Sequence, residues 1–508
     1  MKIFSKLSFF ILGVLGVLYS CNSDDYQGGG GSANNLTFNK IGSIINGTGD
    51  EGFAEISAFD PQTAKLFVVN PNDLKLSVWD LSNPFNPVAG IDIALDGIPN
   101  SVAVHDGLVA VALENAANKQ ANGTVAIYDT DSQTLLETYT AGALPDMVAF
   151  SPNGKYIVIA NEGEPNDNYT IDPEGSVTVI EIGTGEVSQV DFTMFNGQTI
   201  GKDFRVFGPG ATLAQDIEPE YIAVSDDSKT AYVALQENNG IAAIDLITKT
   251  VSYITGLGVK DYSLLENQMD ASDKDGIVGN FQNWPVLGYY HPDAIAFTRV
   301  GGAAFLITAN EGDARDYDGY SEETRVKDLT LDPTTYPDAE TLQLDENLGR
   351  LKTTLANGDT DGDGDMDQIY AYGGRSFTIW STTGDKVYDS GDQISRTVLE
   401  LDSNAFNSNE GDGVDERSDD KGAEPESVET LTVGRNTILF VGLERTGGVM
   451  VYDISNPVSP RFIDWLRDTS DISPEGLITV KAENSPTGNA LVIVTHEVSN
   501  TIAIYEVK

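Results

Sequence analysis

The sequence predicts an all-β protein, a seven-bladed β-propeller that is closed by an N-terminal strand and carries long loop insertions on one face. A unit of three short strands recurs along the chain at intervals of tens of residues, which is typical of repeat architectures. In one such unit, the segments 221–224, 231–235 and 241–246 are rich in β-branched and aromatic residues and are separated by polar turns. This pattern is typical of β-strands.

Seven copies of the unit can be aligned from an acidic or amide residue that opens the first strand, and proline precedes six of these residues. The opening residues are Glu55, Asn100, Asp146, Glu220, Asp293, Glu426 and Glu475. The second strands end at a comparable set of polar residues, Asn70, Glu114, Glu162, Glu237, Glu311, Glu444 and Glu497. The constant order of these features predicts that each copy forms one blade.

A fourth, outer strand follows six of the units. We expect these strands at 88–95, 135–139, 187–194, 251–255 and 461–466, and in the fifth unit at either 386–388 or 398–401. The seventh unit has no such segment before Lys508, whereas an unpaired strand candidate lies at 36–45. We therefore predict that 36–45 completes the last blade and that residues 36–508 form one propeller domain, because ring closure leaves only short strand edges.

The N-terminal segment predicts a bacterial lipoprotein. Residues 1–20 have the features of a signal peptide, with Lys2 and Lys6 before an apolar run at 7–18 that is too short to span a membrane as a helix. Residues 18–21 resemble a lipobox, so Cys21, the single cysteine, is the expected lipidation site. Residues 21–35 form a Gly-rich tether. The residues after Cys21 favour the outer membrane, with exposure at the cell surface as the expected orientation and the periplasm as the alternative.

The composition is strongly acidic. The chain carries 78 acidic and 30 basic residues, a formal net charge of −48. Such a surface repels nucleic-acid phosphates, so we exclude nucleic acid as a partner. The same charge attracts divalent cations, although acidity alone also keeps an exported protein soluble.

The acidic residues cluster on one face. In a propeller, the start of the first strand and the end of the second strand of each blade lie at the same end, so the two polar sets above form two rings around the channel. His291 and His496 lie at these levels, and long insertions at 162–175, 197–216, 257–290, 311–368 and 402–423 open on this face. We predict an acidic mouth that collects metal ions. The alternative is that the carboxylates cap loops and pair with bases such as Arg315 and Arg445.

The most specific motif is a run of alternating carboxylates, Asp359, Asp361, Asp363, Asp365 and Asp367, interrupted by Gly362 and Gly364. Ca²⁺ takes six to eight oxygen ligands, and such spacing supplies them from one loop. Tyr370 stands where an EF-hand has its bidentate glutamate, so the segment is similar to the calcium loops of integrin-type propellers. We predict Ca²⁺ binding that fixes the insertion 311–368; an acidic hairpin without an ion is the alternative.

The segments 158–165, 307–315 and 423–427, with their Asn-Glu-Gly-acidic and Ala-Glu-Pro-Glu-Ser motifs, resemble those of the choice-of-anchor I family. This family is related to mesenchyme-specific cell-surface glycoproteins, and some members are labelled alkaline phosphatase-like. The resemblance covers 36–508 and implies a surface-attached propeller with affinity for calcium. It implies no settled activity.

Two functional hypotheses follow. The first is a binding or scaffold module whose Ca²⁺-ordered acidic face meets a surface protein, a glycan or a mineral. The alternative is a Ca²⁺-dependent phosphoesterase, phytase-like or alkaline-phosphatase-like. The candidates for that chemistry are Glu162, Glu311, Asp313, Glu426 and Glu497, with Arg315 for the phosphate and His291 or His496 for proton transfer. The first hypothesis is favoured, because no complete catalytic constellation can be assembled from the sequence. The three histidines are too few for a two-zinc phosphatase site, which argues against a literal alkaline phosphatase.

Overall fold

The computed structural model describes residues 36–49 and 52–508. Within these residues the strands form seven antiparallel sheets of four or five strands and three smaller sheets. The all-β class expected from the sequence is therefore confirmed. The predicted signal peptide, the lipidation site Cys21 and the tether lie outside the described residues.

The seven large sheets follow the chain order. Sheet 1 contains β2 (Ser57–Asp60), β3 (Lys65–Asn70), β4 (Lys75–Asp80), β5 (Val88–Ala89) and β6 (Ile93–Ala94). Sheet 2 contains β7 (Ile98–His105), β8 (Leu108–Glu114), β9 (Asn122–Asp129) and β10 (Leu135–Ala143). Sheet 3 contains β11 (Pro145–Phe150), β12 (Tyr156–Asn161), β13 (Ser176–Glu181) and β14 (Glu186–Asp191). Sheets 4 and 5 contain β15 (Pro219–Val224), β16 (Thr230–Leu235), β17 (Gly240–Asp245) and β18 (Thr250–Gly256); and β21 (Pro292–Val300), β22 (Ala303–Asn310), β28 (Ser376–Ser381) and β29 (Lys386–Asp389). Sheets 6 and 7 contain β30 (Pro425–Val433), β31 (Asn436–Leu443), β32 (Val449–Asp453) and β33 (Arg461–Leu466); and β34 (Pro474–Val480), β35 (Ala490–His496), β36 (Thr501–Val507) and β1 (Phe38–Ile45).

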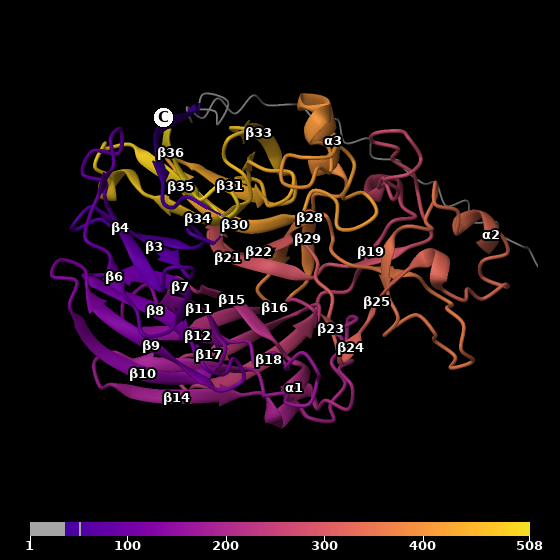
Figure 1. Ribbon diagram of the computed structural model, residues 1–508, viewed down its shortest axis with the longest axis horizontal. Helices are drawn as coiled ribbons and strands as arrows, with labels where there is room; N and C mark the ends of the chain where they lie inside the picture. Colours follow the sequence, from indigo (N-terminus) through magenta and orange to yellow (C-terminus); the bar gives the residue numbers. More distant parts are fainter. Residues whose placement is uncertain (1–35, 50–51) are drawn as a thin grey trace, which may run out of the picture.

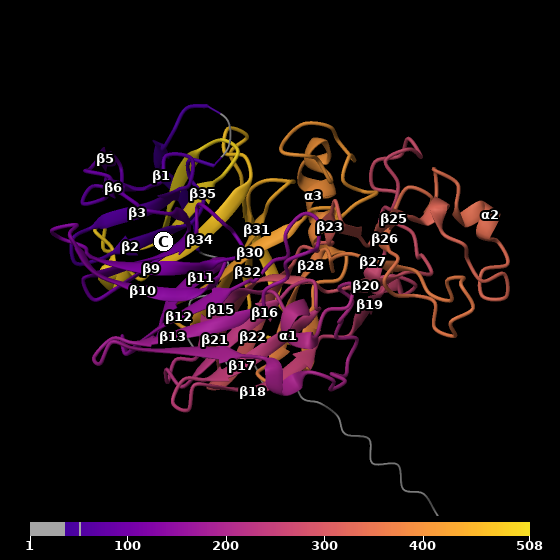
Figure 2. The same cartoon turned by 60° about the horizontal axis from the view of Figure 1, so that its bottom comes forward.

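The first strands of these sheets lie against one another at the centre of the molecule. Contacts join β2 to β7, β7 to β11, β11 to β15, β15 to β21, β21 to β30, β30 to β34, and β34 back to β2. Figures 1 and 2 show the last sheet, in yellow, beside the first, in indigo. This arrangement brings the residues that open the strands to one end of the central region.

The N-terminal strand pairs with the C-terminal strand, as the sequence predicted. β1 runs antiparallel to β36, with Phe38 opposite Val507 and Ile45 opposite Thr501. Two backbone hydrogen bonds between Thr37 and Lys508, of 2.7 and 3.0 Å, continue this ladder beyond Phe38 and Val507. Lys40 adds ion pairs of 2.7 and 2.6 Å to Asp468 and Asp471, which lie in the connection between β33 and β34, so β1 is also held by side-chain contacts.

The outer strand of sheet 5 resolves the alternative left by the sequence. It is β29, and residues 398–401 instead belong to helix α3 (Gln393–Leu401). Ile394 and Val398 of this helix are buried in the core between sheets 5 and 6. Their spacing of four residues places them on one helical face. The outer strand expected at 88–95 is divided into β5 and β6, which both pair with β4.

Two of the long insertions, 257–290 and 311–368, fold into a lobe rather than remaining loops. Its elements are β19 (Val259–Asp261), β20 (Leu287–Tyr289), β23 (Asp316–Tyr317), β24 (Tyr320–Ser321), β25 (Glu323–Arg325), β26 (Lys352–Thr354), β27 (Tyr370–Ala371) and α2 (Ala339–Leu342). Fourteen residues, including Trp284, Val326 and Leu348, form its own hydrophobic core. The lobe projects from sheets 4 and 5 in Figures 1 and 2.

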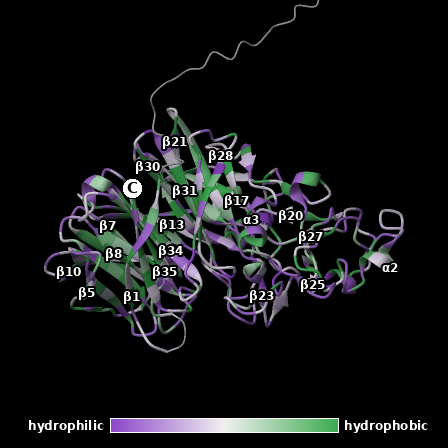
Figure 3. Cartoon of the chain, turned by 90° about the horizontal axis from the view of Figure 1, so that it is seen from above, coloured by the Kyte–Doolittle hydropathy of each residue, from purple (hydrophilic) through white to green (hydrophobic). Residues whose placement is uncertain are grey.

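The remaining helices are short. They are α1 (Leu213–Asp216) and five 3₁₀ turns at Thr193–Phe195, Leu265–Asn267, Val326–Asp328, Ser403–Ala405 and Ala482–Asn484 among the described residues. No helix within 36–49 and 52–508 is long and apolar enough to cross a membrane. Figure 3 shows hydrophobic residues along strands such as β7 and β8 and hydrophilic residues in the connecting loops, which fits a core between packed sheets.

The pairing of β1 predicts a large difference between two adjacent isoleucines. Ile44 is 3% exposed in the core between sheets 7 and 1, whereas Ile45 is 66% exposed. We expect Ile44→Ala to lower the free energy of unfolding by about 2–4 kcal/mol, because it leaves a cavity. The matched control Ile45→Ala changes it by about 0.5 kcal/mol or less. Urea unfolding measures both; equal effects would show that β1 is not packed as described.

Candidate functional site

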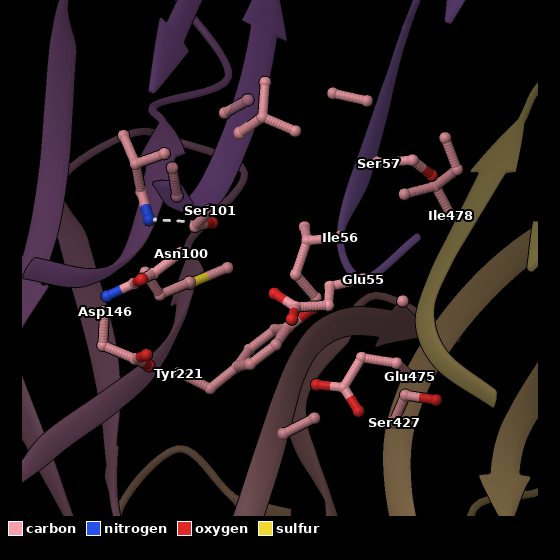
Figure 4. Close-up of a pocket in the computed structure, with 18 of the residues that line it drawn as sticks. Glu55, Ile56, Ser57, Asn100, Ser101, Asp146, Tyr221, Ser427, Glu475 and Ile478 are labelled. Atoms are coloured by element: carbon pink, nitrogen blue, oxygen red, sulfur yellow. Dashed lines mark hydrogen bonds between the residues drawn. The ribbon is translucent and has the colours of Figure 1, made fainter. Parts of the chain in front are cut away.

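A central cavity of about 650 Å³ lies where the first strands meet. It is lined along β7 from Asn100 to His105, along β11 from Asp146 to Phe150 and along β34 from Glu475 to Ile478. Figure 4 shows side chains from these strands and from β2 converging on one space. The cavity therefore follows most of the length of the inner strands, and its two ends are formed by different residues of each strand.

Carboxylates gather at the end where the inner strands begin. Eight of them line the cavity, and seven of these are called the cavity carboxylates below: Glu55, Glu114, Asp146, Glu162, Asp293, Glu426 and Glu475. Within residues 36–49 and 52–508 none of the seven forms an ion pair of 4.0 Å or less with a basic side chain. Glu497 also lines the cavity, and Lys119, a basic residue of the lining, pairs with Glu164.

Burial and mutual repulsion disturb the ionisation of these groups. Burial, with the charges of Glu475, Glu497 and Asp146, raises the pKa of Glu55 to about 8. Burial and Glu164 raise the pKa of Asp146 to about 6. The same causes raise the pKa values of other acids of the two predicted rings well above their usual range: Glu162, Glu220, Asp293, Glu426 and Glu444. The acidic end of the cavity thus holds more carboxyl groups than the neighbouring basic side chains can neutralise.

Most members of the two polar rings predicted from the sequence lie together in the structure. Asn100 and the cavity carboxylates lie where the sequence placed them, at one end of the inner strands. Asn70 does not join them, because its amide oxygen accepts a 2.9 Å bond from the backbone N–H of Asp73 and caps a turn. Glu237 is buried, and burial raises its pKa to about 7. The prediction of an acidic mouth therefore matches the geometry of these residues.

A second acidic group lies beside the cavity. Glu311, Glu424 and Glu444 are buried and place one oxygen each within 4.8 Å of the others. Each has a basic partner: Lys421 at 2.9 Å from Glu311, Arg417 at 2.6 Å from Glu424 and Arg445 at 2.9 Å from Glu444. The group could hold a metal ion, but it is already balanced by three cations.

Glu424 is a site residue that the sequence analysis did not single out. It is fully buried, at 0% exposure, and it has a positive φ of 51°. It directly precedes Pro425, outside the strand-opening position on which the two rings were built. The signal that could have found it is the Ala-Glu-Pro-Glu-Ser motif, in which it is the first glutamate.

Arg315 does not face the cavity carboxylates as a free cation. Its guanidinium is 2% exposed, bonds Asp216 and lies 3.1 Å from Glu218. The ring of Phe207 lies 4.6 Å from it and 3.9 Å from the guanidinium of Arg205, which in turn pairs with Glu322. Arg315 thus joins two insertions, and its donors are committed to protein acceptors. Asp313 is exposed, 3.6 Å from Lys421.

The two candidate histidines are buried. His291 is 0% exposed and lies 3.1 Å from Arg205, and burial together with Arg205 holds its pKa well below its usual range. His496 is 3% exposed, and burial lowers its pKa to about 4. Its Nδ1 lies 3.3 Å from the carbonyl oxygen of Thr501 in β36. Neither ring is part of the cavity lining.

The run of alternating aspartates at 359–367, called the aspartate loop below, is compact, and its first three aspartates are exposed. The backbone N–H groups of Gly362 and Gly364 donate to Asp359 at 2.7 and 3.0 Å, which curls the loop. Oxygens of Asp359, Asp361 and Asp363 come within 4.8 Å of one another. Asp365 and Asp367 are half-buried, and hydrogen bonds from Thr360 hold the pKa of Asp367 below its usual value. Carboxylates so arranged have the chemistry that Ca²⁺ requires.

A family model described as the choice-of-anchor I domain matches residues 55–457. Gigasin-3a of Magallana gigas is 28% identical over 191 residues, which cover 33% of this chain and 67% of that protein. The mesenchyme-specific cell surface glycoprotein of Strongylocentrotus purpuratus is 25% identical over 370 residues, or 63% of this chain. These residues span 46% of that protein, less than half of its length.

Among solved structures, the WD40 domain of coronin from Toxoplasma gondii superposes with a TM-score of 0.48 and 8% sequence identity. The match covers 93% of this chain and 86% of that one. Hydrazine synthase of Kuenenia stuttgartiensis gives a TM-score of 0.47 with 13% identity, covering 91% of this chain and 99% of that one. Likenesses at these scores support no argument about function.

The raised pKa values predict that the protein loses stability as the pH rises. A carboxyl group with a higher pKa in the folded state binds its proton more tightly there than in the unfolded state. The stability that this proton contributes is fully present below the unfolded pKa and is lost as the pH rises through the folded pKa. For Glu55, whose pKa rises from an ordinary 4.5 to about 8 in the folded protein, that window runs from pH about 5 to about 8. We expect the melting temperature in chelator to fall by several degrees across it.

Glu55→Gln should reduce this fall, because it removes the group that must lose its proton. The matched control is Glu137→Gln, which changes an exposed glutamate of β10. Thermal unfolding at a series of pH values measures both variants. A melting temperature that stays level or rises over this range would contradict the repulsion described above.

Proposed function

This chain belongs to the choice-of-anchor I domain family, and from this premise we propose that it is a surface-anchored, calcium-binding β-propeller. In this proposal it acts as a binding or scaffold module through its acidic face. The observation that carries the proposal is the set of cavity carboxylates, which lie together without basic partners in the described part of the chain. Such a set favours a cationic ligand or bound cations.

The propeller itself is part of the proposal. Contacts between successive inner strands run from β2 to β34 and return to β2, and β1 pairs with β36. We infer seven blades arranged as a closed ring, with β1 as the outer strand of the last one. A closed ring explains how sheets with short edge strands form one stable unit.

The surface location is supported by a relative that is itself a cell surface protein. The matching protein of Strongylocentrotus purpuratus is a cell surface glycoprotein. Attachment of this chain through a lipid on Cys21 to the outer membrane, with the acidic face exposed outside the cell, is our proposal for the same location. The partner would then be a surface protein, a glycan or a mineral that presents positive charge or shares bound Ca²⁺.

Ca²⁺ in the aspartate loop would fix the insertion lobe. Asp359, Asp361, Asp363, Asp365 and Asp367 would hold the ion. The loop is anchored to the lobe by a bridge between Leu331 and Met366, and the N–H of Met366 donates at 2.8 Å to Thr330. An ion that neutralises the loop would hold this connection in place, because close carboxylates otherwise repel one another.

The calcium hypothesis predicts a defined loss. Asp361→Asn combined with Asp363→Asn should weaken Ca²⁺ binding by at least about 10–100-fold, the effect typical of disturbing a metal site. In the unaltered protein, chelation should increase cleavage within 311–368 by limited proteolysis. Asp338→Asn, an exposed aspartate of the same insertion, is the control. Unchanged affinity in the double variant, or protease resistance that chelation does not alter, would contradict the assignment.

The alternative function, a Ca²⁺-dependent phosphoesterase, rests on the group of Glu311, Glu424 and Glu444. A metal ion there could activate water and hold a phosphate. The binding function is favoured because Arg315, the expected phosphate ligand, is already committed to Asp216 and Glu218. An anionic substrate would therefore depend on the metal alone for its positive charge.

A hydrolysis assay separates the two functions. We expect no turnover of a panel of phosphate mono- and diesters with Ca²⁺ or with chelator. Calcium-dependent turnover that Glu311→Gln abolishes would overturn the binding assignment and make the protein a hydrolase. The Glu137→Gln protein serves as the control for both outcomes.

A further inference from the structure

The central cavity is polar at one end and apolar at the other. The strand-opening residues Glu55, Asp146 and Glu475 form the acidic end. The lining continues along the same strands to a wall that consists mostly of aliphatic and aromatic side chains, Ala58, Val102, Val104, Val148, Phe150 and Ile478, with His105 stacked on Phe150. From Asn100 to His105 the β7 strand covers about 16 Å, at about 3.3 Å per residue. A ligand that fills the cavity must therefore be charged at one end and hydrophobic at the other.

The spacing of the cavity carboxylates does not suit a single bare metal ion. In the described ranges, two groups bring three ligand atoms within 4.8 Å of one another: Glu311 with Glu424 and Glu444, and the aspartate loop. Neither includes a cavity carboxylate. Ca²⁺ needs oxygens at about 2.3–2.6 Å from one point. The cavity carboxylates are spread around a wider space, which suits an organic cation whose ammonium N–H groups donate hydrogen bonds to carboxylates on more than one side.

Two further features point to a ligand. Ser57 lines the cavity at 2% exposure, and its hydroxyl has no hydrogen-bond partner in the described part of the chain. One carboxylate oxygen of Glu426, also in the lining, is buried without a hydrogen-bond partner there. Buried polar atoms left in this state are uncommon and call for an explanation such as a bound molecule.

An aromatic ring lies among the carboxylates. Figure 4 shows the ring of Tyr221 between the carboxylates of Asp146 and Glu475, with the carboxylate of Glu55 directed toward it. An ammonium group gains from both neighbours, because it pairs with carboxylates and is attracted to the face of an aromatic ring. A hydrated metal ion would gain much less from the ring.

We propose that the cavity binds an alkylammonium ion, an aliphatic primary amine. Its ammonium group lies among Glu55, Asp146 and Glu475 over the ring of Tyr221, and its hydrocarbon chain lies against Val104, Phe150 and Ile478. The inference rests on the proposed function of the acidic face as a binding surface and names its ligand. The volume of about 650 Å³ is within the range of small-molecule sites.

The test is calorimetric titration of the purified protein at pH 8 with n-hexylamine, n-butylamine and 1-hexanol. We expect one hexylamine per chain and an affinity that rises about fourfold for each methylene added between butylamine and hexylamine. The uncharged alcohol should bind at least about tenfold more weakly, because it leaves the carboxylates without a cation. Hexanol that binds as tightly as hexylamine would overturn the proposal.

Variants locate the site. Glu55→Gln and Asp146→Asn should each weaken hexylamine binding by about tenfold, and Tyr221→Leu by about threefold or more. Asp293→Asn gives a further acidic-end variant if one of these fails to fold, which circular dichroism detects. The matched control is Glu483→Gln, an exposed glutamate outside the cavity, and it should leave binding unchanged. Equal binding by control and cavity variants would overturn the site.

Two additional titrations define the ligand and its orientation. Nα-acetyl-lysine amide carries the same ammonium on a polar backbone, and tighter binding of this probe than of hexylamine would overturn the assignment of a free amine with its chain in the apolar half. Ca²⁺ is titrated in parallel, with the Asp361 and Asp363 double variant as reference. Retained Ca²⁺ binding without amine binding refutes this inference alone, whereas loss of both refutes the proposed function.

Discussion

The packing of the inner strands is the constraint from which the character of the site follows. Because these strands lie against one another in chain order, the residues that open six of the seven strands, all except Glu220, are brought to the same end of one cavity. Six of the seven opening residues are acidic, so the fold itself concentrates negative charge there. Stability then requires that the carboxyl groups keep their protons or receive a cation, because burial weakens the screening by water.

Most basic residues that form ion pairs lie outside the cavity lining; Lys119 belongs to the lining and pairs with Glu164. Arg205 and Arg315 are buried with Glu322, Asp216 and Glu218, and they hold insertions together around Phe207. Arginine suits this role because its planar group bonds several acceptors at once. Lys421, Arg417 and Arg445 similarly balance the group at Glu311. With 30 basic residues against 78 acidic ones, the absence of ion pairs among the described cavity carboxylates distinguishes this cavity from the other buried acidic groups.

The strand units and the acidic mouth could be predicted from the sequence, because both depend on local periodicity and on one residue position per unit. The lobe could not, since its core joins residues from two insertions that are distant in the chain, such as Trp284 and Leu348. Helix α3 was ambiguous because the segment 398–401 alone fits a strand, and the buried face of the helix also needs Ile394. The partners of Arg315 and the burial of His291 depend on tertiary contacts that no motif specifies.

The balance of charge also separates recognition from hydrolysis. An enzyme that acts on phosphoesters must attract an anion, and here the guanidinium expected to do so is neutralised by two carboxylates. A substrate anion would meet the cavity carboxylates next, and only bound metal could reverse their repulsion. A cation meets the opposite field: every group that is left without a basic partner at the cavity favours its entry. The electrostatics of the described residues thus support a module that recognises positive charge, with the aspartate loop as a separate site whose ion would order the lobe.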